Sequence, residues 1–221
     1  MTFDIHGLDK IDGYSEEGEE ALYEYQDALI ELFHESPEGA KHRKTYPQMG
    51  FWAQQLIYYG HGYIGVTIPQ MSVANVEEIL LELFPRKISL SSPDEALDTI
   101  PELIAFWEYL KREYKLRKAN AILGYLKGIR PEKFVNIIND PSRFGMAKSF
   151  FSAGQSAGFD MTNEEEMKTF TNLYNASLLE KTQRMLEEPS KSSNQVKIDR
   201  AKEKRKRKAS KAARKRNRRK K

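Results

Sequence analysis

The stretch "SSPDEALDTIPELIAFWEYLKREYKLRKANAILGYLKGI", residues 91–129, decides the fold class of this chain. It opens with Ser92, Pro93 and Glu95, where Glu95 stands three residues after the serine. This is the pattern of a helix start, with a capping hydroxyl, proline at the first helical position and glutamate at the third. The opening of the stretch therefore predicts a helix.

A second helix start follows within the same stretch, where Thr99 and Glu102 flank Pro101. Apolar residues then recur at spacings of four, three and four: Leu103, Trp107, Leu110 and Tyr114. A further apolar series ends close to a glycine, Gly128: Ile122, Leu126 and Ile129. These spacings match the 3.6-residue helical period, so the stretch predicts amphipathic helices rather than strands.

Upstream, residues 15–35 predict another helix. Its apolar residues fall at three- and four-residue spacing: Leu22, Tyr25, Leu29 and Leu32. Residues 36–48 contain two prolines and a glycine, so we expect them to break the helix. Residues 49–59, "MGFWAQQLIYY", fit a second helix, although their aromatic content is also compatible with a strand.

Residues 60–72, "GHGYIGVTIPQMS", predict at most a short extended segment near residues 63–68. The first six residues match G-x-G-x-x-G, which binds a pyrophosphate when it follows a strand and opens a helix. Here a proline stands where that helix should begin, so we interpret the glycines as a turn. We expect the next helix to open at Asn75, capped with Glu78, and to end at Pro85.

Downstream, short helices are expected to open at Pro131 and at Pro141. Residues 152–161, "SAGQSAGFDM", have the composition of a loop. Thr162 and Glu165 then predict the start of a last long helix. Its apolar residues share one face: Met167, Phe170, Tyr174 and Leu178.

The sequence as a whole predicts an all-α fold, an irregular bundle of about seven or eight helices. It predicts a globular domain over residues 1–188 and a flexible Lys/Arg-rich tail over residues 189–221, disordered when alone in water.

Composition excludes several classes of protein and site. The chain has no cysteine, so disulfides, thiol nucleophiles and Cys-ligated metals are absent. We find neither a secretory signal nor a run of about 20 apolar residues that could span a membrane. The expected location is cytoplasmic, or nuclear if the source is eukaryotic.

The four histidines suggest no metal site. His6, His34, His42 and His61 show none of the spacings typical of zinc-binding motifs. The acidic pair Asp94 and Glu95 stands in the first turn of a predicted helix, where the helix dipole explains it without catalysis. We therefore predict no metal and no cofactor.

One stretch of the body, residues 140–161, raises the question of a second site. Arg143 and Lys148 lie near two phenylalanines, Phe150 and Phe151, and several glycines. The stretch could form an anion pocket or a partner groove. A core helix followed by a glycine-rich connection is the interpretation that we favour.

Charge is divided unequally along the chain. Residues 189–221 hold 17 Lys and Arg against 2 Asp and Glu, a local charge of +15, whereas residues 1–188 hold 19 against 30, a charge of −11. The two add to the net charge of +4. A basic segment on an acidic body points to a polyanionic partner.

The densest part of the tail, residues 204–221, is the predicted nucleic-acid-binding site. It contains no acidic and no aromatic residue. Arginine is about as common as lysine in it, and guanidinium groups contact phosphate in bidentate fashion. The predicted phosphate-contacting residues are Lys204, Arg205, Lys206, Arg207, Lys208, Lys211, Arg214, Lys215, Arg216, Arg218, Arg219, Lys220 and Lys221.

Other uses of the tail remain open. The same residues could serve as a nuclear localisation signal or as a solubilising segment. An anionic membrane surface is the weakest alternative, because the tail lacks an apolar face. The acidic body could also hold the basic tail until a stronger polyanion competes.

The sequence thus predicts a non-enzymatic intracellular protein. A helical interaction domain carries a basic arm that binds nucleic acid, RNA in preference to DNA, with little sequence specificity. The alternative is a protein-interaction or regulatory module whose tail serves localisation or solubility. The third is an enzyme whose site assembles only in three dimensions.

Overall fold

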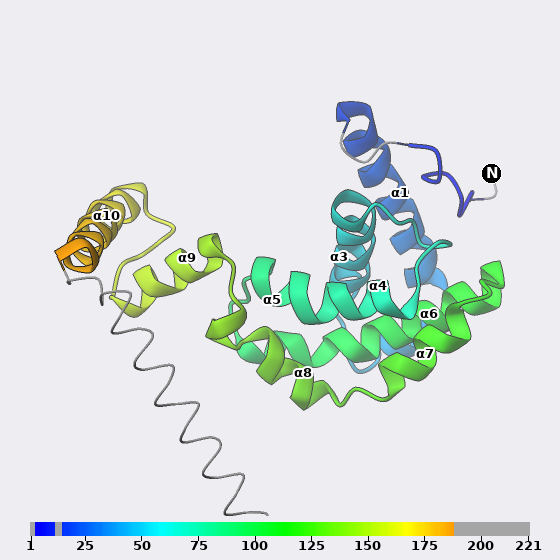
Figure 1. Cartoon of the computed structure of the whole chain (residues 1–221). Coiled ribbons are helices and arrows are strands. Elements are labelled where there is room, and N and C mark those ends of the chain that lie inside the picture. Colours follow the sequence, from blue (N-terminus) through cyan, green and yellow to red (C-terminus); the bar gives the residue numbers. More distant parts are fainter. Residues whose placement is uncertain (1–2, 12–14, 188–221) are drawn as a thin grey trace, which may run out of the picture. The chain divides into compact units, whose positions relative to one another are not determined.

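The computed structural model describes residues 3–11 and 15–187, and within them every regular element is a helix (Figure 1). The predicted all-α fold is confirmed. The chain divides into two compact units, residues 1–157 and residues 158–221. The predicted boundary after residue 188 and the predicted disorder of the tail lie outside the described residues and stay predictions.

Helix α6 (Thr99–Tyr114) is the centre of the first unit. The predicted apolar series is buried at Leu103, Trp107 and Leu110, and Phe106 on an adjoining face is buried too. Burial on more than one face is explained by the helices that pack around α6, which are α2 (Pro37–His42), α3 (Phe51–Tyr59), α7 (Ala119–Lys127) and α8 (Pro131–Ile138).

Helix α1 (Glu16–Glu35) confirms the helix predicted over residues 15–35, and Ser15 caps it by accepting a hydrogen bond from the Gly18 N–H. The buried face of α1 differs from the predicted one at its last position. Phe33 is fully buried there, whereas Leu32 is 37% exposed. The helix breaks at Ser36 as expected. A new helix follows at once, since the Ser36 hydroxyl accepts from the Gly39 N–H and thereby starts α2.

Residues 49–59 form α3 rather than a strand, and the glycine string continues it as a π-helical turn, η1 (Gly60–Ile64). Gly65 ends this turn with a φ of 74°, a conformation that favours glycine. A helix, not a strand, precedes the glycines. The glycines interpreted as a turn thus continue the helix through Ile64, and the context of a dinucleotide-binding loop is missing.

Three contiguous elements follow, namely α4 (Val73–Glu78), the π-helical turn η2 (Ile79–Leu83) and α5 (Phe84–Lys87). The predicted start at Asn75 is wrong, because Ser72 is the cap and Asn75 closes its capping box. The predicted end at Pro85 is also wrong. Helical structure continues past Pro85 to Lys87, and the Arg143 guanidinium donates to the carbonyl of Leu81, one turn before the proline, at 2.9 Å.

Ser92 caps the 3-10 helix η3 (Pro93–Asp98), which leads directly into α6, as the sequence predicts. Beyond α8, Asp140 caps a short 3-10 turn, η4 (Pro141–Arg143), which is followed by α9 (Met146–Ser156). The loop predicted over residues 152–161 is therefore wrong at its start, where α9 continues to Ser156.

The cationic residues of the stretch 140–161 contact backbone. Lys148 is buried, and its ammonium donates to the carbonyls of Pro85, at 3.1 Å, and Ile138, at 3.0 Å. Burial lowers the pKa of the Lys148 amine to about 8. Together with the Arg143–Leu81 hydrogen bond, these contacts favour the structural interpretation of the stretch over an anion pocket.

Replacing Lys148 by methionine is expected to destabilise the protein by about 2 kcal/mol, because two carbonyls lose their donor while the apolar stem is kept. Urea denaturation followed by circular dichroism measures the change. Lys127→Met is the matched control, since Lys127 makes only an exposed ion pair with Glu108 and should cost about 0.5 kcal/mol or less. Equal effects of the two substitutions would contradict the role given to Lys148.

The second unit contains α10 (Glu164–Glu187). Asn163 caps this helix, accepting from the N–H groups of Glu165 and Glu166, so the cap predicted at Thr162 is displaced by one residue. Phe170 is buried against Phe159, with ring centroids 5.4 Å apart. In the part of the chain that the structure describes, no helix combines the length and hydrophobicity needed to cross a membrane.

Candidate functional site

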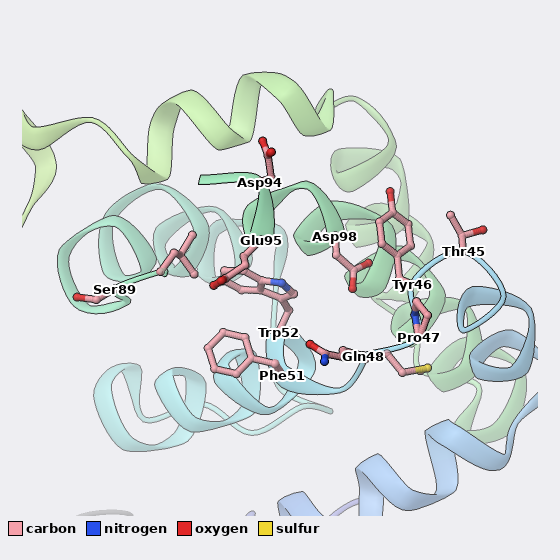
Figure 2. A pocket seen from close by; sticks show the side chains of 12 residues that line it. Thr45, Tyr46, Pro47, Gln48, Phe51, Trp52, Ser89, Asp94, Glu95 and Asp98 are labelled. Carbon is pink, nitrogen blue, oxygen red and sulfur yellow. The ribbon is translucent and has the colours of Figure 1, made fainter. Parts of the chain in front are cut away.

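A cavity of about 670 Å³ in the first unit forms a groove between η3 and the start of α3. Figure 2 shows Glu95 and Asp98 of η3 on one side of it, with Trp52 and Phe51 of α3 facing them. We call this cavity the acidic groove, after three carboxylates among the residues that line it: Asp94, Glu95 and Asp98. None of its twelve lining residues is Lys or Arg.

Aromatic rings form the apolar part of the acidic groove. Trp52 is 3% exposed and contacts Phe51 edge-on, with ring centroids 5.0 Å apart. Phe51 itself is 46% exposed. Tyr46 lines the groove from the loop after α2. Carboxylates beside aromatic faces suit a cationic ligand with an apolar stem, such as a lysine or arginine side chain.

A second groove of about 590 Å³ lies beside the acidic groove, and Thr45 and Tyr46 line both. His42, at the end of α2, belongs to the second groove, and Asp98 belongs to the acidic groove. The His42 Nε2 and Asp98 Oδ1 atoms are 2.8 Å apart. This buried pair therefore lies where the two grooves meet.

Glu102 lies fully buried next to the pair and caps helix α3 from outside that helix. Its two carboxylate oxygens accept hydrogen bonds from the N–H groups of Gly50, at 2.9 Å, and Ala53, at 2.8 Å. Gly50 is the N-cap residue and has no side chain with which to cap the helix. The carboxylate from α6 takes that role at the positive end of the helix dipole.

Gly50 cannot be replaced by an ordinary capping residue. Its φ is 104°, a conformation that favours glycine, and a Cβ atom there would lie 2.8 Å from the His34 Nε2. The cap of α3 consequently depends on a residue 52 positions away in the sequence.

Burial raises the pKa of Glu102 to about 7. The two backbone hydrogen bonds act in the opposite direction, the negative charge of Asp98 raises the pKa further, and His42 lowers it. A buried carboxylate with so high a pKa can hold or release a proton near neutrality.

His42, Asp98 and Glu102 form a cluster that we call the buried triad. Each residue offers one nitrogen or oxygen atom, and all three atoms lie within 4.8 Å of one another. The Tyr46 ring stacks on the His42 ring, with centroids 5.1 Å apart and planes 22° from parallel. Such a set can act in proton transfer or as metal ligands.

The residues predicted from sequence to bind nucleic acid, Lys204–Lys221, lie outside the described residues, so this prediction stays a prediction. The buried triad was not predicted. The sequence interpreted Glu102 as a capping residue of its own helix, and His42 as an ordinary histidine. One signal pointed to Glu102, which stands four residues before the buried Phe106 and seven before the buried Tyr109, on an apolar face of α6.

Similarity to known proteins adds no assignment. When the chain was compared with protein-family models, with curated proteins and with solved structures, no match was found.

Proposed function

We propose that this protein binds nucleic-acid phosphates through the basic arm, residues 204–221, while its helical body serves as an interaction module and not as an enzyme. The observation that carries the proposal is the separation of charge: +15 in residues 189–221 and −11 in residues 1–188. Each phosphate neutralised by Lys or Arg releases a counterion, which gives strong binding at low salt.

The acidic surface of the body favours the arm, and not the body, as the part of the protein that contacts phosphate. Glu77, Glu78 and Glu82 are exposed along α4 and η2, where a polyanion would be repelled. The acidic groove is also negatively charged, so it would repel a polyanion as these glutamates do. Because the arm has no aromatic residue to stack on bases, binding with little sequence preference follows. RNA is preferred over DNA, since arginine-rich arms fold on structured RNA and the body offers no helix suited to a DNA groove.

The test compares three proteins in a salt series against a structured RNA and a DNA duplex. They are the full-length chain, a chain ending at Glu188, and a full-length variant in which the 13 Lys and Arg of residues 204–221 are glutamine. We expect only the first to bind, with a log–log salt slope of about −5 or steeper, and at least a hundredfold loss in the others. Failure of the full-length protein to bind at near-physiological salt would overturn the proposal.

The acidic groove favours a second candidate function, a protein-interaction module whose tail serves localisation or solubility. Three carboxylates and exposed Phe51 suit a basic segment of a partner protein. A photo-crosslinker at Phe51 in the full-length protein tests it. Partner crosslinks should disappear when Asp94→Asn and Glu95→Gln are combined, and crosslinks that persist in this variant would exclude the groove.

A further inference from the structure

We propose that the buried triad of His42, Asp98 and Glu102 binds one divalent transition-metal ion of the Zn²⁺ type. The site lies in the helical body and is independent of nucleic-acid binding by the arm. Three features carry the inference, namely the convergence of the ligand atoms, an unaligned contact within the triad, and the fixed orientation of two of its side chains.

The spacing of the ligand atoms fits a single ion. No two of the three atoms are more than 4.8 Å apart, and His42 Nε2 and Asp98 Oδ1 are 2.8 Å apart. Ligand atoms around a tetrahedral Zn²⁺ ion lie about 3.3 Å from one another, given metal–ligand distances of about 2.0–2.2 Å. Small side-chain shifts therefore suffice to place all three atoms around an ion.

The contact between His42 and Asp98 lacks the alignment of a hydrogen bond. Although the two atoms are 2.8 Å apart, neither His42 Nε2 nor Asp98 Oδ1 has a hydrogen-bond partner among the described residues, and both are inaccessible to solvent. The His42 side chain is only 6% exposed. When His42 is protonated the two groups form an ion pair, but the contact is not aligned as a hydrogen bond. Buried polar atoms are almost always satisfied, and a cation coordinated by both atoms would satisfy them together.

Neighbouring groups hold the ligands in place. The Gly50 and Ala53 N–H groups fix the Glu102 carboxylate, and each of its oxygens keeps a second lone pair for a metal. The Tyr46 ring stacks on the imidazole of His42 and limits its rotation. Outer groups that orient the ligands in this way are typical of metal sites.

The donor set selects the class of ion. Two ionised carboxylates carry the charge that balances a divalent cation. An imidazole ligand favours Zn²⁺, Fe²⁺ or Co²⁺ over Mg²⁺ and Ca²⁺, which prefer oxygen, and the absence of sulfur disfavours Cu⁺. Three protein ligands leave a fourth position for water or a ligand, as in catalytic rather than structural zinc sites. His42 lines the second groove and Asp98 the acidic groove, so the site lies between these two cavities.

The test is titration calorimetry of chelator-treated full-length protein with ZnCl₂, together with absorption spectra after addition of CoCl₂. We expect one equivalent of Zn²⁺ with a Kd of about 10 µM or tighter, and visible Co²⁺ bands typical of low coordination number. At a hundredfold excess of Zn²⁺ over the Kd, the Tm should rise by about 5 °C or more. His42→Ala and Asp98→Asn should each weaken binding at least tenfold.

The matched control is His6→Ala combined with Asp9→Asn. This pair has the same chemistry and spacing, 2.7 Å between His6 Nδ1 and Asp9 Oδ2, but His6 is exposed. The control variant should bind Zn²⁺ like the wild type. Absence of a one-to-one event, or equal affinity in His42→Ala and wild type, would overturn the proposal. If His42→Ala does not fold, selective broadening of the His42 ring signals by Co²⁺ in the wild-type NMR spectrum decides instead.

Discussion

Replacing Glu102 by alanine is expected to lower the free energy of unfolding by about 3 kcal/mol when a chelator keeps metal away. Two buried N–H groups, those of Gly50 and Ala53, then lose the carboxylate that accepts their hydrogen bonds, and each such loss costs about 1–3 kcal/mol. The capping end of α3 also loses the negative charge that its dipole favours. Urea denaturation followed by circular dichroism gives the value.

Two further variants separate this effect from a general loss of charge. Glu102→Gln keeps one acceptor oxygen and should cost about half as much. Glu108→Ala, on the exposed side of the same helix, removes only an ion pair with Lys127 and should change stability by about 0.5 kcal/mol or less. A Glu102→Ala protein as stable as Glu108→Ala would show that α3 is capped by some other group.

Gly39→Ala is the second substitution with a large expected effect, about 3 kcal/mol or more. A Cβ atom on Gly39 would lie 2.0 Å from the backbone oxygen of Phe33, which no side-chain rotation can relieve. Helix α2 must therefore move away from the end of α1. Because α2 carries His42 at its last position, the same movement should weaken Zn²⁺ binding at the buried triad.

The matched control for Gly39→Ala is Gly124→Ala, in the middle of α7. A Cβ atom at Gly124 meets nothing within 4 Å, and alanine favours helix, so this variant should be more stable by about 0.5–1 kcal/mol. Thermal and urea unfolding compare the two variants with the wild type. Similar stability of Gly39→Ala and Gly124→Ala would contradict the close approach of α2 to α1.

Local patterns in the sequence predicted most of the helices, because caps and apolar periods act within about four residues. Ser92 is a cap where it was expected, and Pro131 and Pro141 open short helices as predicted. The errors also arose locally. The sequence placed a cap at Asn75 instead of Ser72, and one at Thr162 instead of Asn163, because several polar residues near a helix start can accept the same N–H groups.

Pro85 shows what local rules could not predict. Proline removes one hydrogen bond from a helix, and the sequence therefore ended the helix there. In the folded protein helical structure continues to Lys87, and Arg143 donates to the carbonyl of Leu81, 62 residues away from it and one turn before Pro85. Lys148 likewise became a structural residue only when packing brought it to the carbonyls of Pro85 and Ile138.

The sequence by itself determined the all-α class, through helical periods and starts, and the charge of the basic arm, through composition. Only the tertiary structure decided the buried triad, because His42, Asp98 and Glu102 come from α2, η3 and α6 and meet when these helices pack. The same packing made Glu102 the cap of α3, whose capped N–H groups lie 52 and 49 residues earlier in the sequence. Contacts over such separations depend on how helices pack around α6, and neither periodicity nor composition encodes that arrangement.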